Sequence, residues 1–389
     1  MNVKQIYELV NGTVGEILGK EDLLNEDLTN IVDVGKEIID TDNIDNYTRK
    51  LVNHIGKVVF VNRKYSGNVP SVLIDGWEYG SILQKISADL PKASENASWN
   101  LQDGESYDPN VFYQPKVSAK FFNSKVTFEI PMSFTEMQVK ESFSNAEQLN
   151  GFISMLFNSV ENAITVKVDN LIMRTINSMI GETVFNDLKA TDSDKLITSR
   201  TTPRAVNLLT LYKQSSGKTI TVDKAMYEPD FIRFASYIIS LYKGRISKIS
   251  TLFNVGGKER FTSNDDLHLV LLEDFASSSK IFLESGTYNN ELVTLPAYES
   301  IPYWQGSGKN YDLEDTSKIN VKITNDKVVE MTNILGVMFD THALGVTNLD
   351  KRVTTNYNPK ADYNNKKVVN LLIDLKLKLI ILKMNIILL

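Results

Sequence analysis

The chain has 389 residues, of which 42% are hydrophobic and 23% charged, and its formal net charge is −6. This composition is typical of a globular protein of two or three domains, or of one large body with a long insertion, and it excludes wholesale disorder. The chain contains no cysteine, which excludes disulfides, thiol catalysis, zinc fingers and iron–sulfur clusters. Its mild acidity argues against tight non-specific binding to nucleic acid. Because the first ten residues lack a basic stretch followed by an apolar core, we expect no signal peptide and a cytoplasmic origin.

The N-terminal part is predicted to be mainly helical. Apolar residues at helical spacing over 3–18 predict an amphipathic helix, which Asn11, Gly12 and Gly19 are expected to shorten or break. A second amphipathic stretch near 46–54 leads into the β-branched run 57–61. That run predicts the first strand.

The next part of the chain is dominated by turn-forming residues. Gly, Ser, Asn, Asp and Pro recur over 66–115, and strand-like alternation resumes over 117–134. Two strand signals around about fifty loosely patterned residues predict a long projecting hairpin, and an insertion of that length is usually functional. An ordinary small subdomain is the alternative.

The strongest local signal is a long helix. Ser144 and Glu147 match the spacing of a capping box, and apolar residues then recur every three or four positions until Gly181, a candidate C-terminal glycine. Such a helix would be roughly 55 Å long, which suggests a structural spine. A coiled coil is the alternative, but the polar face lacks regular charged pairs.

The remainder alternates between helices and strands. Thr202 and Pro203 are expected to begin a helix as N-cap and first residue. Further helices are predicted over 229–250 and 273–283, and strands over 267–272, within 292–304, over 319–323, and as two segments within 334–356. This pattern indicates a mixed α/β domain followed by late β segments.

Two glycine-rich segments invite comparison with phosphate-binding loops. The run 306–310 (Gly-Ser-Gly-Lys-Asn) lacks the earlier glycine, because Tyr303 stands there, and it lacks a Ser or Thr after the lysine, because Asn310 follows. We therefore expect no nucleotide site, and the run 255–258 is expected to be a turn.

Acidic residues and histidines give no coherent catalytic pattern. The acids at 273–274 could bind a metal, but acids at a strand–helix junction more often complement the helix dipole. Residues 264–266 lack the spacing of a calcium loop. The three histidines, His54, His268 and His342, are scattered along the chain. We expect no catalytic, cofactor-binding or metal-binding residues, no cofactor and no enzymatic activity.

The last 24 residues form an unusual tail. Leu, Ile, Lys and Asn occupy 20 of the 24 positions in 366–389. The segment is a poor candidate for a membrane span, because three lysines interrupt its apolar residues: Lys376, Lys378 and Lys383. An amphipathic surface helix is one interpretation. An atypical tail, such as a frameshifted reading frame would encode, is the interpretation that we favour.

The order of these elements resembles the major capsid protein of tailed bacteriophages, which has the Johnson (Hong Kong ninety-seven-like) fold. The likeness is closest to short-tailed phages of the phi twenty-nine type that infect Gram-positive bacteria. The segments that carry it are LVNHIGKVV at 51–59, the helical stretch 152–171, DLHLV at 266–270, and the stretch 343–359 that begins with ALG. The likeness covers about residues 25–365, and the tail departs from it because β-type sequence is expected there.

The resemblance implies an α+β fold with an N-terminal arm, an extended loop, a spine helix, and peripheral and axial domains. The implied ranges are 1–57 for the arm and first peripheral elements, 58–133 for the extended loop, 134–181 for the peripheral domain with the spine helix, 182–330 for the axial domain, 331–365 for peripheral strands, and 366–389 for the atypical tail.

The implied function is that of a major head protein, which self-assembles through pentamers and hexamers into an icosahedral or prolate shell around a double-stranded DNA genome. The implied partners are further copies of the chain, a scaffolding protein, a portal and non-specifically held DNA, with no membrane. The protein would be located in the virion after assembly in the bacterial cytoplasm. An encapsulin-like nanocompartment shell and a mixed α/β enzyme remain as alternatives.

Overall fold

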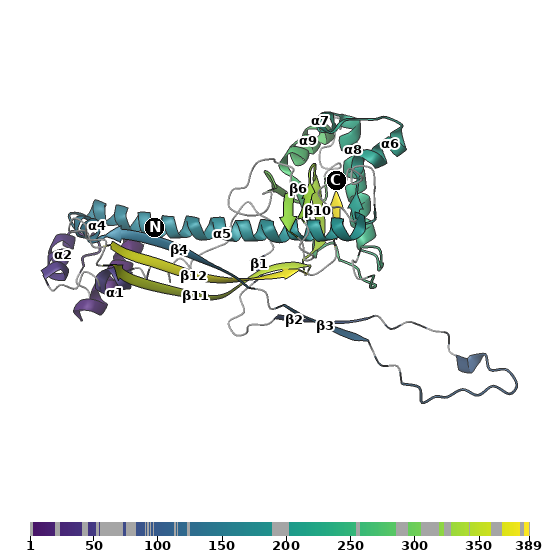
Figure 1. Cartoon of the computed structure of the whole chain (residues 1–389), viewed down its shortest axis with the longest axis horizontal. Coiled ribbons are helices and arrows are strands. Elements are labelled where there is room, and N and C mark those ends of the chain that lie inside the picture. The colour runs from purple at the N-terminus through teal and green to yellow at the C-terminus, as the bar shows by residue number, and fades with distance from the viewer. Residues whose placement is uncertain are drawn as a thin grey trace.

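The protein is elongated and is organised around one long helix (Figure 1). The computed structural model describes residues 3–19, 24–40, 46–51, 54, 73–74, 83–89, 91, 93, 95, 97–112, 114, 116–122, 125–188, 202–253, 257–284, 295–304, 319–322, 328–341, 343–358, 368–381 and 385–388. A helical cluster surrounds one end of the long helix, a mixed α/β body lies at the other end, and a hairpin projects away from both. The strand predicted over 57–61 lies outside the described residues.

The helical cluster contains α1 (Val3–Leu18), α2 (Ile31–Asp40), a helical stretch at 46–51 and α4 (Glu136–Ser142). Its buried apolar side chains join those of the long helix in one core. The expectation that α1 is interrupted at Asn11 and Gly12 is wrong. Asn11 instead links α1 to the segment at Leu24, because its side-chain oxygen accepts a hydrogen bond from the Leu24 amide at 3.2 Å. Gly19, with φ +66°, ends the helix as expected.

α2 and the segment after α4 approach each other closely at Gly35. A Cβ atom placed on Gly35 would lie 2.6 Å from the Cβ of Phe143. Phe143 is buried and its ring packs against that of Tyr47, with ring centroids 5.2 Å apart. The Phe143 side chain therefore cannot move aside without disturbing a second buried ring.

We expect Gly35→Ala to lower the free energy of unfolding by about 1–3 kcal/mol, the usual cost of overpacking a core. The matched control is Gly151→Ala, where an added Cβ meets nothing within 4 Å. In that helical position alanine should stabilise by about 0.5–1 kcal/mol. Urea unfolding of both variants measures the difference, and equal effects would contradict the packing described for Gly35.

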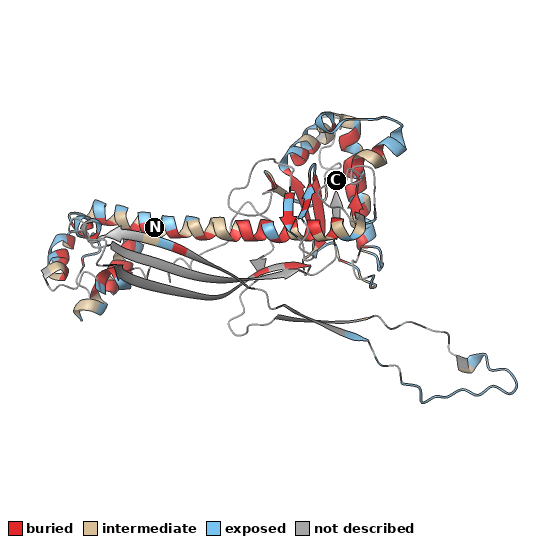
Figure 2. Ribbon diagram, viewed as in Figure 1, coloured by how far each residue is buried: buried red, intermediate tan, exposed pale blue. Residues whose placement is uncertain are grey.

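The long helix, α5, spans Ala146–Leu188, which corresponds to about 65 Å. Two details of its predicted ends are wrong. The N-cap side chain is Asn145, whose oxygen accepts from the Gln148 amide at 2.8 Å, and not Ser144. The helix also continues past Gly181, because the residues beyond it are packed against the α/β body. Figure 2 shows that α5 is buried on one side near its start and almost all round near its end.

A four-stranded sheet lies along α5 with the strand order β1-β11-β12-β4. These strands are β1 (Leu73–Ile74), β11 (Leu344–Asn358), β12 (Val368–Ile381) and β4 (Lys125–Thr135). β12 pairs antiparallel with β11 on one side and with β4 on the other. The expectation that residues 366–389 form a tail or a surface helix outside the fold is therefore wrong for 368–381, and it is also wrong for 385–388, which pair with residues 336–339 in a second sheet.

The mixed α/β body contains a five-stranded sheet with the order β5-β13-β10-β6-β7. Its strands are β5 (Ala205–Val206), β13 (Asn385–Leu388), β10 (Gly336–Asp340), β6 (Leu267–Leu272) and β7 (Glu299–Ile301). Helices α6 (Leu208–Ser216), α7 (Val222–Ala225), α8 (Pro229–Ile246) and α9 (Glu273–Glu284) form a second core with this sheet. A separate pair, β8 (Ile319–Lys322) and β9 (Val328–Met331), contacts α5.

Several sequence predictions for this body are confirmed, and one is wrong. α8, β6, α9 and β10 lie where the apolar periodicity placed them. Thr202 and Pro203, however, do not begin a helix. The next helix is α6, whose N-cap is Asn207 with its side chain accepting from the Thr210 amide at 2.8 Å. The chain first forms the short strand β5, which pairs parallel with β13.

Among the described residues, Trp304 has the largest fully buried side chain. Its indole Nε1 donates a hydrogen bond to the Ile334 carbonyl at 2.9 Å. Replacing Trp304 with phenylalanine keeps an aromatic ring but leaves that buried carbonyl without its donor. We expect a loss of about 1–3 kcal/mol in the free energy of unfolding from the unpaired acceptor alone. Urea unfolding measures it, with Trp99→Phe as control because Trp99 is 85% exposed. Equal effects at the two tryptophans would contradict the prediction.

Candidate assembly surfaces

The projecting hairpin consists of β2 (Leu83–Ala88) and β3 (Val117–Phe122), which pair antiparallel, with the short 3₁₀ helix η1 (Ala97–Trp99) near its far end. The sequence predicted a long hairpin that includes the strand-like segment 117–134, and the resemblance gave its range as 58–133. That assignment is wrong for β4, which pairs with β12 in the four-stranded sheet. The projecting hairpin therefore contains fewer residues than predicted, because β4 is not part of it.

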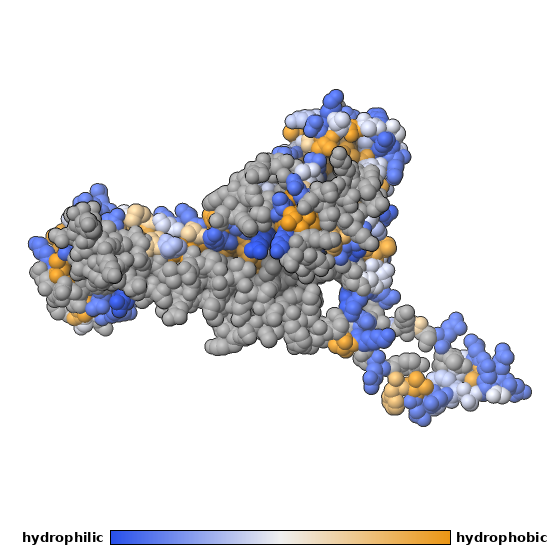
Figure 3. All heavy atoms as spheres, viewed as in Figure 1, coloured by the Kyte–Doolittle hydropathy of each residue, from blue (hydrophilic) through white to orange (hydrophobic). Residues whose placement is uncertain are grey.

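The far end of the hairpin, residues 97–112 (the hairpin tip), exposes large apolar side chains. Trp99 is 85% exposed and Phe112 is 90% exposed, and Leu101, Tyr107 and Val111 are each about half exposed. Figure 3 shows apolar side chains among polar ones at this end. Several large apolar side chains exposed together on one projecting segment favour a contact with another molecule.

Local hydrogen bonds shape the hairpin tip. The Glu105 amide donates to the Gln102 carbonyl at 3.0 Å, closing a turn in which Gly104 has φ +94°. The Asn110 amide donates to the Asp108 carboxylate at 2.9 Å. Because these bonds are made within the tip, its conformation is set locally while its aromatic side chains stay exposed.

The paired part of the hairpin is joined to the α/β body at the end nearer its tip. The Asp89 amide donates to the Lys116 carbonyl at 2.9 Å, which continues the strand pairing by one residue. The Asp89 carboxylate lies 3.0 Å from Nζ of Lys258, a residue in the loop that follows α8. Lys258 was predicted to lie in a simple turn, and the adjacent Gly257 does have φ +65°. This ion pair helps to fix the direction in which the hairpin leaves the body.

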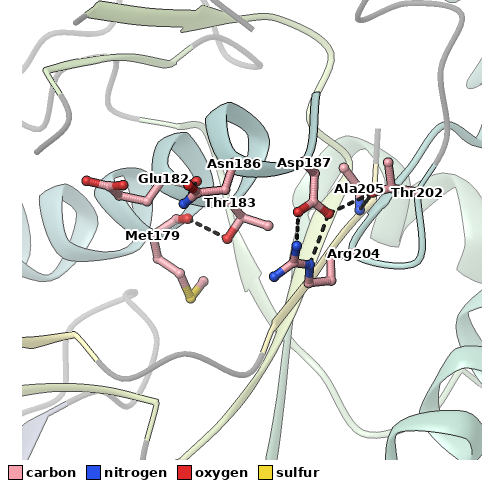
Figure 4. A network of polar contacts seen from close by, with 8 residues as sticks. All are labelled: Met179, Glu182, Thr183, Asn186, Asp187, Thr202, Arg204 and Ala205. Carbon is pink, nitrogen blue, oxygen red and sulfur yellow. Dashed lines mark hydrogen bonds and ion pairs between the residues drawn. The ribbon is translucent and has the colours of Figure 1, made fainter. Parts of the chain in front are cut away.

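A second polar network joins the end of α5 to the five-stranded sheet (Figure 4). Arg204 donates from Nε to Asp187 Oδ2 at 3.0 Å and from its second nitrogen, Nη2, to Oδ1. The Thr202 hydroxyl donates to the same carboxylate at 2.8 Å and accepts from the Ala205 amide at 2.9 Å. The Asp187 side chain is 3% exposed and that of Arg204 is 16% exposed. The network therefore ties β5 to the last turn of α5.

The remaining residues singled out in the sequence are held by local contacts. Glu273 and Asp274 lie in the first turn of α9, as expected for charges that complement a helix dipole. Asp266 accepts from the Ser263 hydroxyl at 2.6 Å and stabilises the turn before β6. The run 306–310 lies outside the described residues.

The two histidines that the structure describes, His54 and His268, have separate acidic partners. His54 Nε2 lies 3.2 Å from Oε1 of Glu16, whose Oε2 also pairs with Lys50. The hydrogen bond from Lys50, followed by that from His54, lowers the pKa of the Glu16 carboxyl. His268 Nδ1 lies 3.1 Å from Glu299 on the neighbouring strand. His342 lies outside the described residues.

The described residues offer neither a metal cluster nor a helix suited to a membrane. They contain no group of three or more His, Asp or Glu side chains placed to hold a metal ion. None of the described helices combines the length and the apolarity that a membrane crossing requires.

Sequence reasoning did not identify the exposed residues of the hairpin tip. It recognised the insertion as a long, loosely patterned segment, but Trp99 and Phe112 follow no period that would mark them. The one available signal was the presence of isolated large aromatic residues in a segment otherwise rich in Asn, Asp, Gly and Ser.

Comparison with solved structures defines the class of fold. A chain of the structure described as "head fiber and inner core protein gp22 of native bacteriophage P68" is similar over 82% of this chain and 83% of its own length, with a TM-score of 0.50 and 10% identity. The capsid structure of Staphylococcus phage Andhra matches over 84% and 87%, with a TM-score of 0.47 and 10% identity. The structure of Mycobacterium phage Ogopogo matches over 82% and 96%, with a TM-score of 0.36 and 13% identity. The match to the phage P68 chain shows that this mixed fold of helices and strands is shared with a chain of a bacteriophage particle.

Sequence comparison defines the family. Residues 13–370 match the family described as Phi29-like phage major capsid protein. The chain belongs to this family, so it is a shell protein of the virion that associates with copies of itself. No curated protein matches the chain.

Proposed function

We propose that the chain forms the head shell of a double-stranded DNA phage through pentamers and hexamers in which the projecting hairpin lies over a neighbouring copy. In this proposal α5 is the spine helix, and it forms the peripheral domain together with the four-stranded sheet. The body built on the five-stranded sheet is the axial domain at capsomer centres, and the α1–α2 region is the N-terminal arm.

The observation that carries this proposal is the exposed hairpin tip. A folded subunit gains nothing by holding Trp99 and Phe112 in water on the end of a projecting hairpin, whereas burial of a large aromatic side chain stabilises an interface by about 2 kcal/mol or more. Many such contacts per shell act together, so individually modest interfaces produce a stable closed assembly.

Further partners follow from the role of a head protein. We propose that a scaffolding protein guides assembly, that a portal occupies one vertex, and that the packaged DNA is held without sequence recognition. The net charge of −6 supports the last point, because a strongly basic subunit would bind the packaged DNA tightly. The subunit carries out no catalytic step in this role.

The experiment is expression of the chain alone and with a candidate scaffolding protein, followed by sucrose-gradient sedimentation and negative-stain microscopy. We expect closed shells, tubes or capsomers in at least one of the two conditions. Exclusively monomeric protein in both conditions, with the subunit folded by circular dichroism, would contradict the proposal.

A further inference from the structure

The hairpin tip is acidic as well as aromatic. Residues 97–112 contain Asp103, Glu105 and Asp108 and no lysine or arginine. All three acids are exposed, like the aromatic side chains between which they lie. A partner surface for this tip should therefore offer both apolar area and positive charge.

A surface with those two properties lies at the end of α8. Residues 245–253 and 257–262, here called the basic loop, carry four basic side chains, Arg245, Lys248, Lys258 and Arg260, and one acidic side chain, Glu259. Arg245 and Lys248 are exposed. The basic loop is thus a local positive region on a subunit whose net charge is negative.

The basic loop also exposes large apolar side chains. Ile249 is 56% exposed, Leu252 is 57% exposed and Phe261 is 55% exposed. Ser250 and Arg260 form an antiparallel bridge, exchanging backbone hydrogen bonds of 2.9 and 3.1 Å. The residues flanking that pair, Ile249 and Phe261, are therefore opposite each other on one face of the bridge. Ile249 and Phe261 together form an exposed apolar contact area.

The hairpin tip does not contact the basic loop of its own chain. Lys258 pairs instead with Asp89, directly after the last paired residue of β2, and from there the tip projects away from the α/β body (Figure 1). Only a second copy can bring a tip onto this loop without rebuilding the hairpin.

We infer that the basic loop is the surface that receives the acidic, aromatic hairpin tip of a neighbouring subunit. This inference rests on the proposed function and specifies the contact that joins the subunits. Trp99 and Phe112 pack against the Ile249 and Phe261 face, while the acids of the tip lie against Arg245 and Lys248. The opposite charges steer the approach and set the orientation, and the aromatic side chains supply the buried area.

Charge reversal tests the contact. The loop variant carries Arg245→Glu and Lys248→Glu, and the tip variant carries Asp103→Lys and Glu105→Lys. Each alone places like charges across the contact, so we expect shell yield to fall by at least about tenfold in either variant. The combined variant restores opposite charges in exchanged positions, and we expect its yield to return close to that of the wild-type chain.

A matched control separates this contact from a general effect of charge. Lys213→Glu with Lys224→Glu makes the same change in net charge on exposed residues of α6 and α7, in the same body. We expect this variant to assemble normally. Circular dichroism and thermal unfolding establish that every variant is folded before assembly is scored.

The absence of cysteine allows a second measurement. In the chain carrying Asp103→Cys and Lys248→Cys, the introduced thiols are the only ones present. Oxidation of assembled particles should give a ladder of disulfide-linked multimers on a non-reducing gel. Neither single-cysteine variant should give one.

The outcomes distinguish this contact from the function on which it rests. Wild-type protein that forms no shells contradicts the proposed function itself. Shells that form normally from the loop variant, or a combined variant that is not rescued and gives no ladder, overturn the inference while leaving the shell function standing. A loop variant that assembles but retains less DNA would assign the basic loop to the genome and would also overturn the inference.

Discussion

Replacing Asp187 with alanine should lower the free energy of unfolding by about 3–5 kcal/mol, the largest single effect on stability that the structure predicts. The substitution leaves the guanidinium of Arg204 in a mostly buried position without its carboxylate, and it removes the acceptor of the Thr202 hydroxyl. An ionised group buried without a partner costs far more than one that is paired. Urea unfolding followed by circular dichroism measures the change.

The coupling between the two residues can be isolated by a double-mutant cycle. Arg204→Ala alone should also be strongly destabilising, but the pair Asp187→Ala with Arg204→Ala should cost about 0.5–3 kcal/mol less than the sum of the two single changes. Lys218→Ala, which breaks the exposed ion pair with Asp230, serves as control and should change stability little. Additive effects at Asp187 and Arg204 would show that the network does not join α5 to the sheet as described.

The second large effect concerns assembly. Trp99→Ser combined with Phe112→Ser should leave the subunit folded with an unchanged unfolding midpoint, because both side chains are almost fully exposed. The same variant should fail to form shells, since truncation of a buried aromatic anchor typically costs 2 kcal/mol or more at each interface and the loss recurs at every contact. Sedimentation and negative-stain microscopy measure the result.

Retaining the rings provides the matched comparison. Trp99→Tyr with Phe112→Tyr keeps two aromatic surfaces at the hairpin tip, and we expect it to assemble, with reduced shell stability. Normal assembly of the serine variant would show that the hairpin tip does not help to hold the shell together. A serine variant that fails to fold would contradict the exposure described for these two side chains.

The elements that sequence predicted well are those with a strong local period. α8 and β6 each bury a face whose spacing is visible in the chain, and each is bounded by a recognisable signal, such as Pro229 at the start of α8. Turn chemistry identified the general extent of the projecting insertion. It did not show that β4 pairs with β12 and not with a strand of the hairpin, because strand pairing depends on which strands lie side by side in the folded chain.

The errors have specific physical causes. Gly181 resembles a helix end, but α5 continues to Leu188 because tertiary contacts, including the ion pair of Asp187 with Arg204, hold its last turns. The final residues were interpreted from composition, although 373–379 alternate between apolar and charged residues, which is the period of a strand. The hairpin tip gave no periodic signal, because residues that bind a partner need only be exposed.

The most direct test of the account is cryo-electron microscopy of assembled wild-type particles at a resolution that traces the chain. We expect residues 97–112 of each copy to lie against residues 245–253 and 257–262 of a neighbouring copy, with Trp99 and Phe112 buried between them. Hairpin tips that project free of the shell, or that fold back onto their own subunit, would contradict it.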